Sequence, residues 1–406
     1  MDNISSLELF SGAGGLALGM AKNGVHHKAL VEWNKDACNT LRDNFKSEIV
    51  HNMDICDFEF KKFGHIDVVA GGPPCQPFSL GGKHKGSMDH RDMFPYACKA
   101  VSVCTPSAFI FENVKGLLRK SFSSYFGYII LRLTYPGIDK NTSESWEDHL
   151  HRLEKVHTAQ NYSGIKYNVV FRLIDAADYG IPQRRERVII VGIRDDLGVE
   201  WGFPKKTHSL ESLVWSQFVS EDYWKRHGIK PADVACYDGR TGGLIKKLRD
   251  NLWLFAPEIK PWRTIRDQLE DVPSPDKEGT FHPEHIFRDG ARVYPGHTGS
   301  FIDLPSKTIK AGGHGVPGGE NMLRTSDGHV RYYTTYEAKL LQTFPKNYSV
   351  HGSWTESMRQ IGNAVPVELS KLISASVIKC ISKNGNAQQK DSLDCFSLPQ
   401  KIASDL

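Results

Sequence analysis

Short apolar runs alternate with segments of helical periodicity over about the first 200 residues. The apolar runs predict strands at residues 7–10, 28–33, 67–70, 108–111, 167–173 and 188–193. Between them, residues 16–23 and 37–45 have the spacing of amphipathic helices. This alternation is typical of an α/β fold, in which helices cover both faces of a mostly parallel sheet. Ligands of such sheets bind at the carboxyl ends of the strands, so the loops after the first four strands should meet at one site.

The rest of the chain departs from this alternation. Residues 121–164 are polar and are interpreted as an insertion between two strands, with a helix expected in the second half. After about residue 205, tryptophans are interleaved with Lys, Arg and His, and a glycine-rich run follows at 311–319. This composition predicts a second lobe with long loops. Residues 367–381 predict an amphipathic helix, and the tail from residue 383 is polar.

The composition limits the class of protein. A chain of 406 residues is too long for one small core and predicts two or three lobes. Its net charge of +4 is compatible with a polyanionic partner but does not establish one. The 8 cysteines show neither CxxC pairs nor the spacing of a zinc site, so we expect a reducing compartment and no bound metal. No apolar window reaches ~20 residues, so we expect no membrane span. The first residues lack the pattern of a signal peptide, and we expect a cytoplasmic protein.

Cys75 stands in the most distinctive stretch of the sequence, GGPPCQPFS at residues 71–79. The apolar run before it predicts a buried strand, and the prolines stiffen the exit from that strand. A rigid turn at a strand end suits a nucleophile, and a thiol there needs an electropositive setting to ionise. A buried, inert cysteine is the commoner case in proteins, but the flanking prolines favour a turn over a packed strand.

A glycine-rich turn, FSGAGG at residues 10–15, lies between the first predicted strand and the first predicted helix. Gly12, Gly14 and Ala17 fit the nucleotide-binding pattern G-x-G-x-x-[GA]. Glu32 closes the next strand, where a carboxylate could hold two ribose hydroxyls. The turn therefore indicates a nucleoside cofactor without saying which one, and a tight turn with no ligand fits the same residues.

Further charged residues lie at the ends of other predicted strands. Asp54 and Ile55 end a predicted third strand, where they could contact an adenine, although a solvated acid fits equally well. Glu112 follows the strand at 108–111, where partial burial would let it carry a proton near neutral pH. Capping of the following helix is the alternative role for Glu112. The run QRRER at 183–187 is compatible both with a solvated surface and with a position facing the site.

A nucleoside-binding turn, a thiol, a carboxylic acid and clustered arginines are together what is needed to add a thiolate to an electron-poor ring and protonate it. Six motifs appear in the order LFSGAGGL, GGPPCQPFS, FENVKG, YGIPQRRERV, YEAKLLQTFP and RQIGNAVP. In this order they closely resemble the DNA cytosine-5 methyltransferases of bacterial restriction–modification systems. The resemblance covers nearly the whole chain apart from 121–164, 205–330 and the tail, and it displaces the dinucleotide interpretation of the glycine turn.

The resemblance implies a fold and a division into domains. We expect the Rossmann-like sheet of S-adenosylmethionine-dependent methyltransferases in residues 1–204, with the insertion at about 121–164. A second, smaller target-recognition domain would span 205–333. A return segment at 334–382 would complete the catalytic domain, and 383–406 would form a polar tail.

The resemblance also implies S-adenosylmethionine as the methyl donor. Glu32 would take the ribose, Trp33 would stack near the adenine, and the residues after the third strand would hold that ring. The full set of expected cofactor-binding residues is Phe10, Ser11, Gly12, Gly14, Gly15, Leu16, Glu32, Trp33, Asp54, Ile55, Pro74, Asn363, Ala364 and Val365.

On the same resemblance, the target cytosine would leave the duplex, because its C6 atom is out of reach inside the stack. Cys75 would add to C6, and Glu112 would hydrogen-bond or protonate N3. Arg185 and Arg187 would contact the flipped base, with Arg187 reaching O2. The loop after Cys75 would close over DNA, and its phosphate-contacting residues would be Lys83, His84 and Lys85. Candidate base readers in the second lobe are Arg240, Arg292, Lys310 and His314.

The expected partner is double-stranded DNA, and the expected role of this monomer is to protect host DNA from a paired restriction endonuclease that forms no stable complex with it. Two other functions fit parts of the sequence. A methyltransferase of the same fold could act on tRNA, although the large lobe at 205–330 favours sequence-specific duplex DNA. A DNA-binding protein that had lost catalysis would have no need to retain the thiol, the acid and both arginines.

Overall fold

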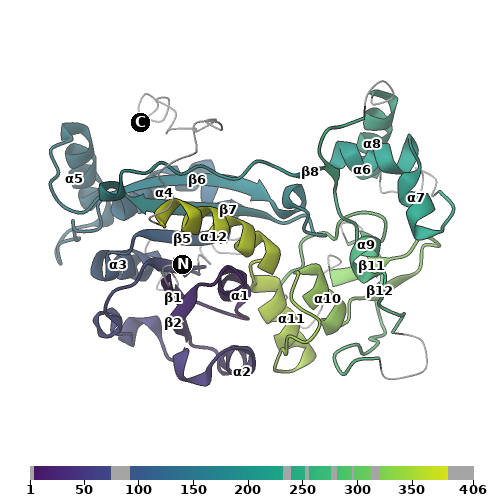
Figure 1. Cartoon of the computed structure of the whole chain (residues 1–406), viewed down its shortest axis with the longest axis horizontal. Helices are drawn as coiled ribbons and strands as arrows, with labels where there is room; N and C mark the ends of the chain where they lie inside the picture. The colour runs from purple at the N-terminus through teal and green to yellow at the C-terminus, as the bar shows by residue number, and fades with distance from the viewer. Residues whose placement is uncertain are drawn as a thin grey trace.

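The computed structural model describes residues 4–74, 92–231, 239–251, 256–275, 281–294, 297–311 and 321–382, apart from the side chains of 239–241. A larger lobe contains the main sheet and the helices that cover it, and a smaller lobe contains the elements from β8 to β12 (Figure 1). No helix in the described part of the chain is long and apolar enough to cross a membrane.

The main sheet has seven strands in the order β3-β2-β1-β4-β5-β7-β6. Its strands are β1 (Ser5–Leu9), β2 (His26–Glu32), β3 (Val50–Asn52), β4 (Val68–Gly71), β5 (Ala108–Val114), β6 (Tyr167–Asp175) and β7 (Glu186–Arg194). The first five run parallel, whereas β7 pairs antiparallel with both β5 and β6. The predicted Rossmann-like, mostly parallel sheet is confirmed.

Helices cover both faces of this sheet because its central strands are apolar on both sides. On one face, α3 (Phe94–Cys104) and α4 (Ser123–Thr134) pack over Leu7, Phe109 and Phe111. On the other face, α1 (Gly15–Ala21) and α12 (Val367–Ile381) pack over Val68 and Ile110. Figure 1 shows α12 beside α1, although the two helices come from opposite ends of the chain.

The segment 121–164 is more regular than the sequence indicated. Both of its halves are helical, because α4 precedes α5 (Trp146–Ala159). The helix expected in the second half is confirmed by α5, whereas α4 in the first half was not predicted. Phe126 of α4 packs edge-to-face on Phe171 of β6 with 4.7 Å between ring centroids, so the first half is held by apolar contact with the sheet.

The smaller lobe also contains more regular structure than its long-loop composition predicted. Its helices are α6 (Leu210–Phe218), α7 (Asp222–His227), α8 (Gly239–Asn251) and α9 (Ile265–Leu269). Its short strands are β8 (His208–Ser209), β9 (Lys260–Pro261), β10 (Ser300–Phe301), β11 (Met322–Arg324) and β12 (Val330–Tyr332). Trp224 and Trp262 lie buried in its core beside Tyr223, so these tryptophans are packing residues.

The chain then returns to the larger lobe through α10 (Thr335–Leu341), α11 (Trp354–Asn363) and α12. α10 begins with a capping box between Thr334 and Glu337, which explains why the helix starts there. The Ser370 hydroxyl of α12 donates to the Leu16 carbonyl over 2.6 Å. This contact fixes the end of the chain against the first helix.

Candidate active site

The glycine turn after β1 has an unusual backbone that its sequence permits. Phe10, Gly12 and Gly14 have φ angles of 55°, 53° and 76°, in the left-handed region that favours glycine. A side chain added at Gly12 would meet no atom within 4 Å, so this side of the turn is open. Leu16, by contrast, points its side chain into the core against α12, so only its backbone remains near the turn.

Glu32 joins the turn to the end of β2. Its Oε2 accepts from the Gly12 amide over 2.9 Å, and its Oε1 accepts from the amides of Trp33 and Asn34 over 3.0 and 2.9 Å. The carboxylate is buried and held by three backbone donors. Next to it, the Trp33 side chain is 76% exposed. The fixed acid and the free indole therefore lie at the same edge of the sheet.

Two further predicted cofactor residues follow β3. Asp54 is exposed and accepts from the Cys56 amide over 2.9 Å, and this bond lowers the pKa of Asp54. Ile55 beside it is buried in the core of the larger lobe. The strand ends at Asn52 rather than at Asp54, so the acid caps the turn that follows the strand.

The end of α11 reaches the glycine turn from the far end of the chain. A side chain on Gly15 would lie 2.2 Å from the Val365 carbonyl and 3.3 Å from the Ala364 methyl group. Asn363 is exposed at the end of α11. The structure thus brings the RQIGNAVP motif against the first glycine turn, as the resemblance implied.

Glu112 and Arg187 form an ion pair on neighbouring strands. The Nε atom of Arg187 lies 2.7 Å from Oε1 of Glu112, and both side chains are largely buried. The contact with Glu112 favours the charged form of Arg187. Glu112 lies inside β5, which continues to Val114, so the alternative role as a helix cap is wrong.

The chain that leads to Cys75 runs beside this pair. The Asn113 side chain donates to the Pro73 carbonyl over 2.9 Å, and a side chain on Gly72 would lie 3.5 Å from Oε2 of Glu112. Pro74 is the last described residue before 92, so Cys75 and the predicted loop residues Lys83, His84 and Lys85 lie outside the described residues. Asn113 had no predicted role, although it stands directly after the acid in the FENVKG motif.

Arg185 is buried with little to compensate its charge. Its side chain is 1% exposed, and Nη1 makes one long contact of 3.5 Å to the Ile309 carbonyl. Its Nε has no hydrogen-bond partner among the described residues. Burial lowers the pKa of Arg185 well below its usual value; the nearby Arg187 lowers it further, and Glu112 acts in the opposite direction. Burial likewise lowers the pKa of Arg187.

The Arg184 side chain contacts Asp175 and Trp262. Its Nε lies 3.0 Å from Oδ2 of Asp175, and its guanidinium lies over the Trp262 ring at 5.2 Å. The QRRER run is therefore not simply a solvated charge run, because Arg185 and Arg187 lie at Glu112 while Arg184 contacts the smaller lobe. Gln183 in the same run is fully buried, and its role was missed at the sequence level.

The structure describes the side chains of two of the four candidate base readers. Arg292 and Lys310 are exposed in the smaller lobe. The Arg240 side chain and the whole of His314 lie outside the described residues. Across the part of the chain that the structure describes, no group of three or more His, Cys, Asp or Glu side chains is placed to hold a metal ion.

Comparison with known proteins identifies the family. The profile of the C-5 cytosine-specific DNA methylases matches residues 4–137 and 146–379. Within 121–164, only 138–145 fall outside this match, and the lobe after residue 205 is covered as well. The Type II methyltransferase M.PspPI of a Psychrobacter strain is 30% identical over 389 residues, which are 95% of this chain and 81% of the relative. M.Eco47II of Escherichia coli is 29% identical over 93% of this chain and 79% of its own length.

Solved structures share the fold. A DNA modification methyltransferase encoded within an E. coli prophage superposes with a TM-score of 0.56 at 20% identity, over 93% of this chain and 99% of that chain. The Dnmt2 methyltransferase of S. pombe gives a TM-score of 0.54 at 16% identity, over 93% and 98% of the two chains. The chain belongs to the C-5 cytosine-specific DNA methylases, enzymes that transfer a methyl group from S-adenosylmethionine to the C5 atom of cytosine in DNA.

Proposed function

We propose that this enzyme methylates one cytosine within a short, specific sequence of duplex DNA, through base flipping and a transient bond between Cys75 and C6. The observation that carries the proposal is the buried cluster of Glu112, Arg185 and Arg187. This cluster lies beside the described chain that ends at Pro74, and Cys75 is the next residue in the sequence. A buried acid with two buried arginines suits a polar ring that must be held and protonated.

The residues around the glycine turn fit S-adenosylmethionine. The carboxylate of Glu32 is held in place by three amides and retains lone pairs for ribose hydroxyls. The exposed Trp33 offers a face for the adenine, and the open side at Gly12 leaves room for close approach. When bound, S-adenosylmethionine supplies the electrophilic methyl group that C5 accepts.

The protein residues perform the remaining chemistry. The Cys75 thiolate adds to C6 and moves ring electrons toward C5, while Glu112 holds a proton at N3 and so limits the charge that builds up on the ring. Arg187, paired with Glu112, donates to O2 of the base. After methylation a base, for which water suffices, removes the C5 proton, and expulsion of Cys75 restores the aromatic ring and the free thiolate.

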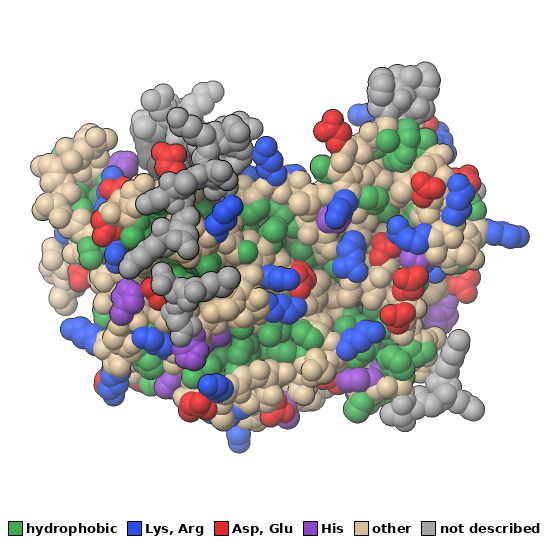
Figure 2. Space-filling view, in the orientation of Figure 1, with side chains coloured by type: hydrophobic (Ala, Val, Ile, Leu, Met, Phe, Trp, Pro, Cys, Tyr) green, Lys and Arg blue, Asp and Glu red, His purple; other side chains and the backbone are tan. Residues whose placement is uncertain are grey.

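The substrate is proposed to be duplex DNA. Figure 2 shows several Lys and Arg side chains over the middle of this face, interspersed with hydrophobic side chains. Cations in this position suit phosphate contacts, whereas exposed loops of the smaller lobe suit reading of base edges. We divide the chain accordingly into a catalytic domain at 1–204, a recognition domain at 205–333 and a return segment at 334–382.

The biological role follows from the relatives. The matched curated proteins are named Type II methyltransferases. We infer that this enzyme is a bacterial, cytoplasmic monomer that protects host DNA from a paired restriction endonuclease without a stable complex between the two. Bisulfite sequencing of DNA from cells that express this chain would identify the protected sequence, and methylation of tRNA instead of duplex DNA would contradict the proposal.

A mechanism-based trap tests the role of Cys75. With S-adenosylmethionine and a duplex that carries 5-fluorocytosine at the target, the C5 fluorine cannot be removed as a proton is, so the enzyme should remain bound to the DNA through denaturation. The Cys75→Ser variant should form no adduct. Cys56→Ser, at an exposed cysteine after β3, is the matched control and should trap as the wild type does. An adduct that persists in Cys75→Ser would contradict the proposed nucleophile.

A further inference from the structure

A segment of the smaller lobe lies along the turn that carries the arginines. The Ser306 amide donates to the Pro182 carbonyl over 2.9 Å, and the Arg184 amide donates to the Ser306 carbonyl over 2.7 Å. The Thr308 hydroxyl donates to the Arg184 carbonyl over 2.7 Å. The two stretches of backbone therefore form a short parallel bridge between the lobes.

Beyond this bridge, two side chains of the turn hold one peptide group. The Ile309 amide donates to Oε1 of Gln183 over 3.2 Å, and the Ile309 carbonyl accepts from Nη1 of Arg185 over 3.5 Å. Gln183 and Arg185 are 0% and 1% exposed. The Ile309 backbone thus links the Gln183 amide to the Arg185 guanidinium.

This link matters because Arg185 has few other contacts. Within the described chain, the Ile309 carbonyl is the one hydrogen-bond acceptor of the Arg185 side chain, and Nε has none. A buried guanidinium with one long hydrogen bond has a weakly determined orientation. Whatever fixes the Ile309 peptide therefore also fixes where the charge of Arg185 points.

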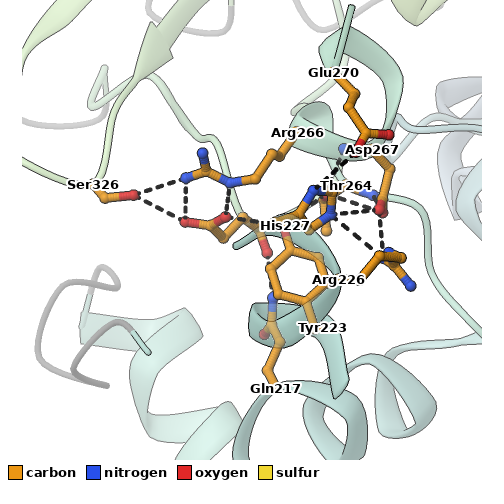
Figure 3. Close-up of polar contacts among 10 residues, drawn as sticks. Gln217, Tyr223, Arg226, His227, Thr264, Arg266, Asp267, Glu270 and Ser326 are labelled. Carbon is orange, nitrogen blue, oxygen red and sulfur yellow. Dashed lines mark hydrogen bonds and ion pairs between the residues drawn. The ribbon is translucent and has the colours of Figure 1, made fainter. Parts of the chain in front are cut away.

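The segment is anchored firmly at its other end. Asp303 is fully buried, and its carboxylate accepts from Nε of Arg266 over 2.6 Å and from the Tyr223 hydroxyl over 2.9 Å. Figure 3 shows the Arg266, Tyr223 and Ser326 side chains converging in this network. The Leu304 carbonyl also accepts from the Ile265 amide over 2.9 Å. The stretch that contacts Gln183 is thus part of the rigid framework of the smaller lobe.

We propose that Gln183 is a positioning residue for Arg185: through the Ile309 peptide it sets the guanidinium in the active site, so that a correctly placed smaller lobe is needed for fast catalysis. The inference rests on the proposed role of Arg185. Two of the groups involved, Nε2 of Gln183 and Nε of Arg185, have no hydrogen-bond partner within the described residues.

Substitution of Gln183 separates positioning from folding. Gln183→Met keeps the volume but removes the acceptor for the Ile309 amide, whereas Gln183→Glu keeps an oxygen there. At saturating DNA and S-adenosylmethionine, Gln183→Met should lower the single-turnover rate constant of methyl transfer about tenfold or more, with the Kd for DNA changed less than about threefold. Gln183→Glu should restore the rate to within about threefold of the wild type.

Tyr128→Phe is the control. Tyr128 is also buried, and its hydroxyl forms a hydrogen bond of 3.0 Å with Nδ1 of His149 between α4 and α5, away from the arginines and from the Asp303 network. This variant should lower Tm without the loss in rate constant. A wild-type rate in Gln183→Met, or an equal loss in Gln183→Met and Gln183→Glu, would overturn the inference. If Arg185→Gln also keeps the wild-type rate, the failure lies in the proposed role of Arg185 rather than in its positioning.

Discussion

Nε of Arg187 lies 2.7 Å from Oε1 of Glu112, and the two residues come from adjacent strands that run in opposite directions. The start of β7 therefore lies at the carboxyl end of β5. This arrangement explains why the QRRER run, which stands at the start of β7, lies at the same edge of the sheet as residues that stand at the carboxyl ends of the parallel strands. Because both side chains are largely buried, each depends on the other to compensate its charge.

Glu112→Gln should lower the rate of methyl transfer by about 10²-fold or more, because the amide cannot hold and release a proton at N3. The measurement is single-turnover transfer at saturating substrates, on protein shown to be folded by circular dichroism. Glu186→Gln is the control, since Glu186 forms an exposed ion pair with Lys115 at 2.9 Å on the neighbouring position of β7. Equal losses in the two variants would argue against a specific role for Glu112.

Trp33→Ala should weaken S-adenosylmethionine binding about fivefold, the scale of roughly 1 kcal/mol expected for lost aromatic stacking. Because the Trp33 side chain is 76% exposed, its removal should leave Tm unchanged. Isothermal titration calorimetry measures the Kd. Phe287→Ala, at an aromatic that is 41% exposed in the smaller lobe, should leave that Kd as it is. A Trp33→Ala variant with wild-type affinity would remove Trp33 from the cofactor site.

Gly15→Ala should destabilise the fold by about 3 kcal/mol, the upper part of the range for overpacking, because its new methyl group would lie 2.2 Å from the Val365 carbonyl. The clash would push the end of α11 away from the glycine turn, so cofactor affinity should fall as well. Urea denaturation and calorimetry measure the two effects.

Gly127→Ala in α4 is the contrasting substitution. A side chain at Gly127 would meet no atom within 4 Å, and alanine is the better helix former by about 1 kcal/mol. This variant should therefore be slightly more stable than the wild type. A destabilised Gly127→Ala variant would show that the space around Gly15 and Gly127 does not determine how alanine changes the stability of the protein.

Glu8 should make the stability of the protein fall as the pH rises. It is buried in β1, and burial raises the pKa of its carboxyl group from 4.5 to about 8. Between these values the native state keeps a proton that the unfolded chain has released, so the free energy of unfolding should fall by about 1.4 kcal/mol per pH unit.

The Glu8→Gln variant isolates this effect, because its neutral amide does not titrate. From pH 6 to pH 7.5 the wild type should lose about 2 kcal/mol of unfolding free energy relative to Glu8→Gln, as measured by urea denaturation at each pH. The comparison cancels the contributions of other titrating groups. Parallel pH profiles for the two proteins would show that Glu8 is already ionised in the native state.

The sequence by itself determined the order of the elements and the motifs that identify the family. Apolar runs located the strands to within a few residues, because a strand buried on both faces must be apolar throughout. The spacing of glycines, acid and thiol at strand ends pointed to a single site, since the carboxyl ends of parallel strands share one edge. The resemblance also implied that residues 363–365 return to the first glycine turn, where Ala364 and Val365 lie against Gly15.

Only the tertiary structure decided which side chains at that edge lie together in the candidate site and which contact other parts of the molecule. The reversed direction of β7, which periodicity does not record, brings Arg185 and Arg187 to Glu112 and leaves Arg184 at the smaller lobe. The same packing turns Leu16 into the core and buries Gln183 against Ile309. These outcomes depend on contacts between residues far apart in the sequence, and a local pattern holds no information about the partner that a side chain will meet.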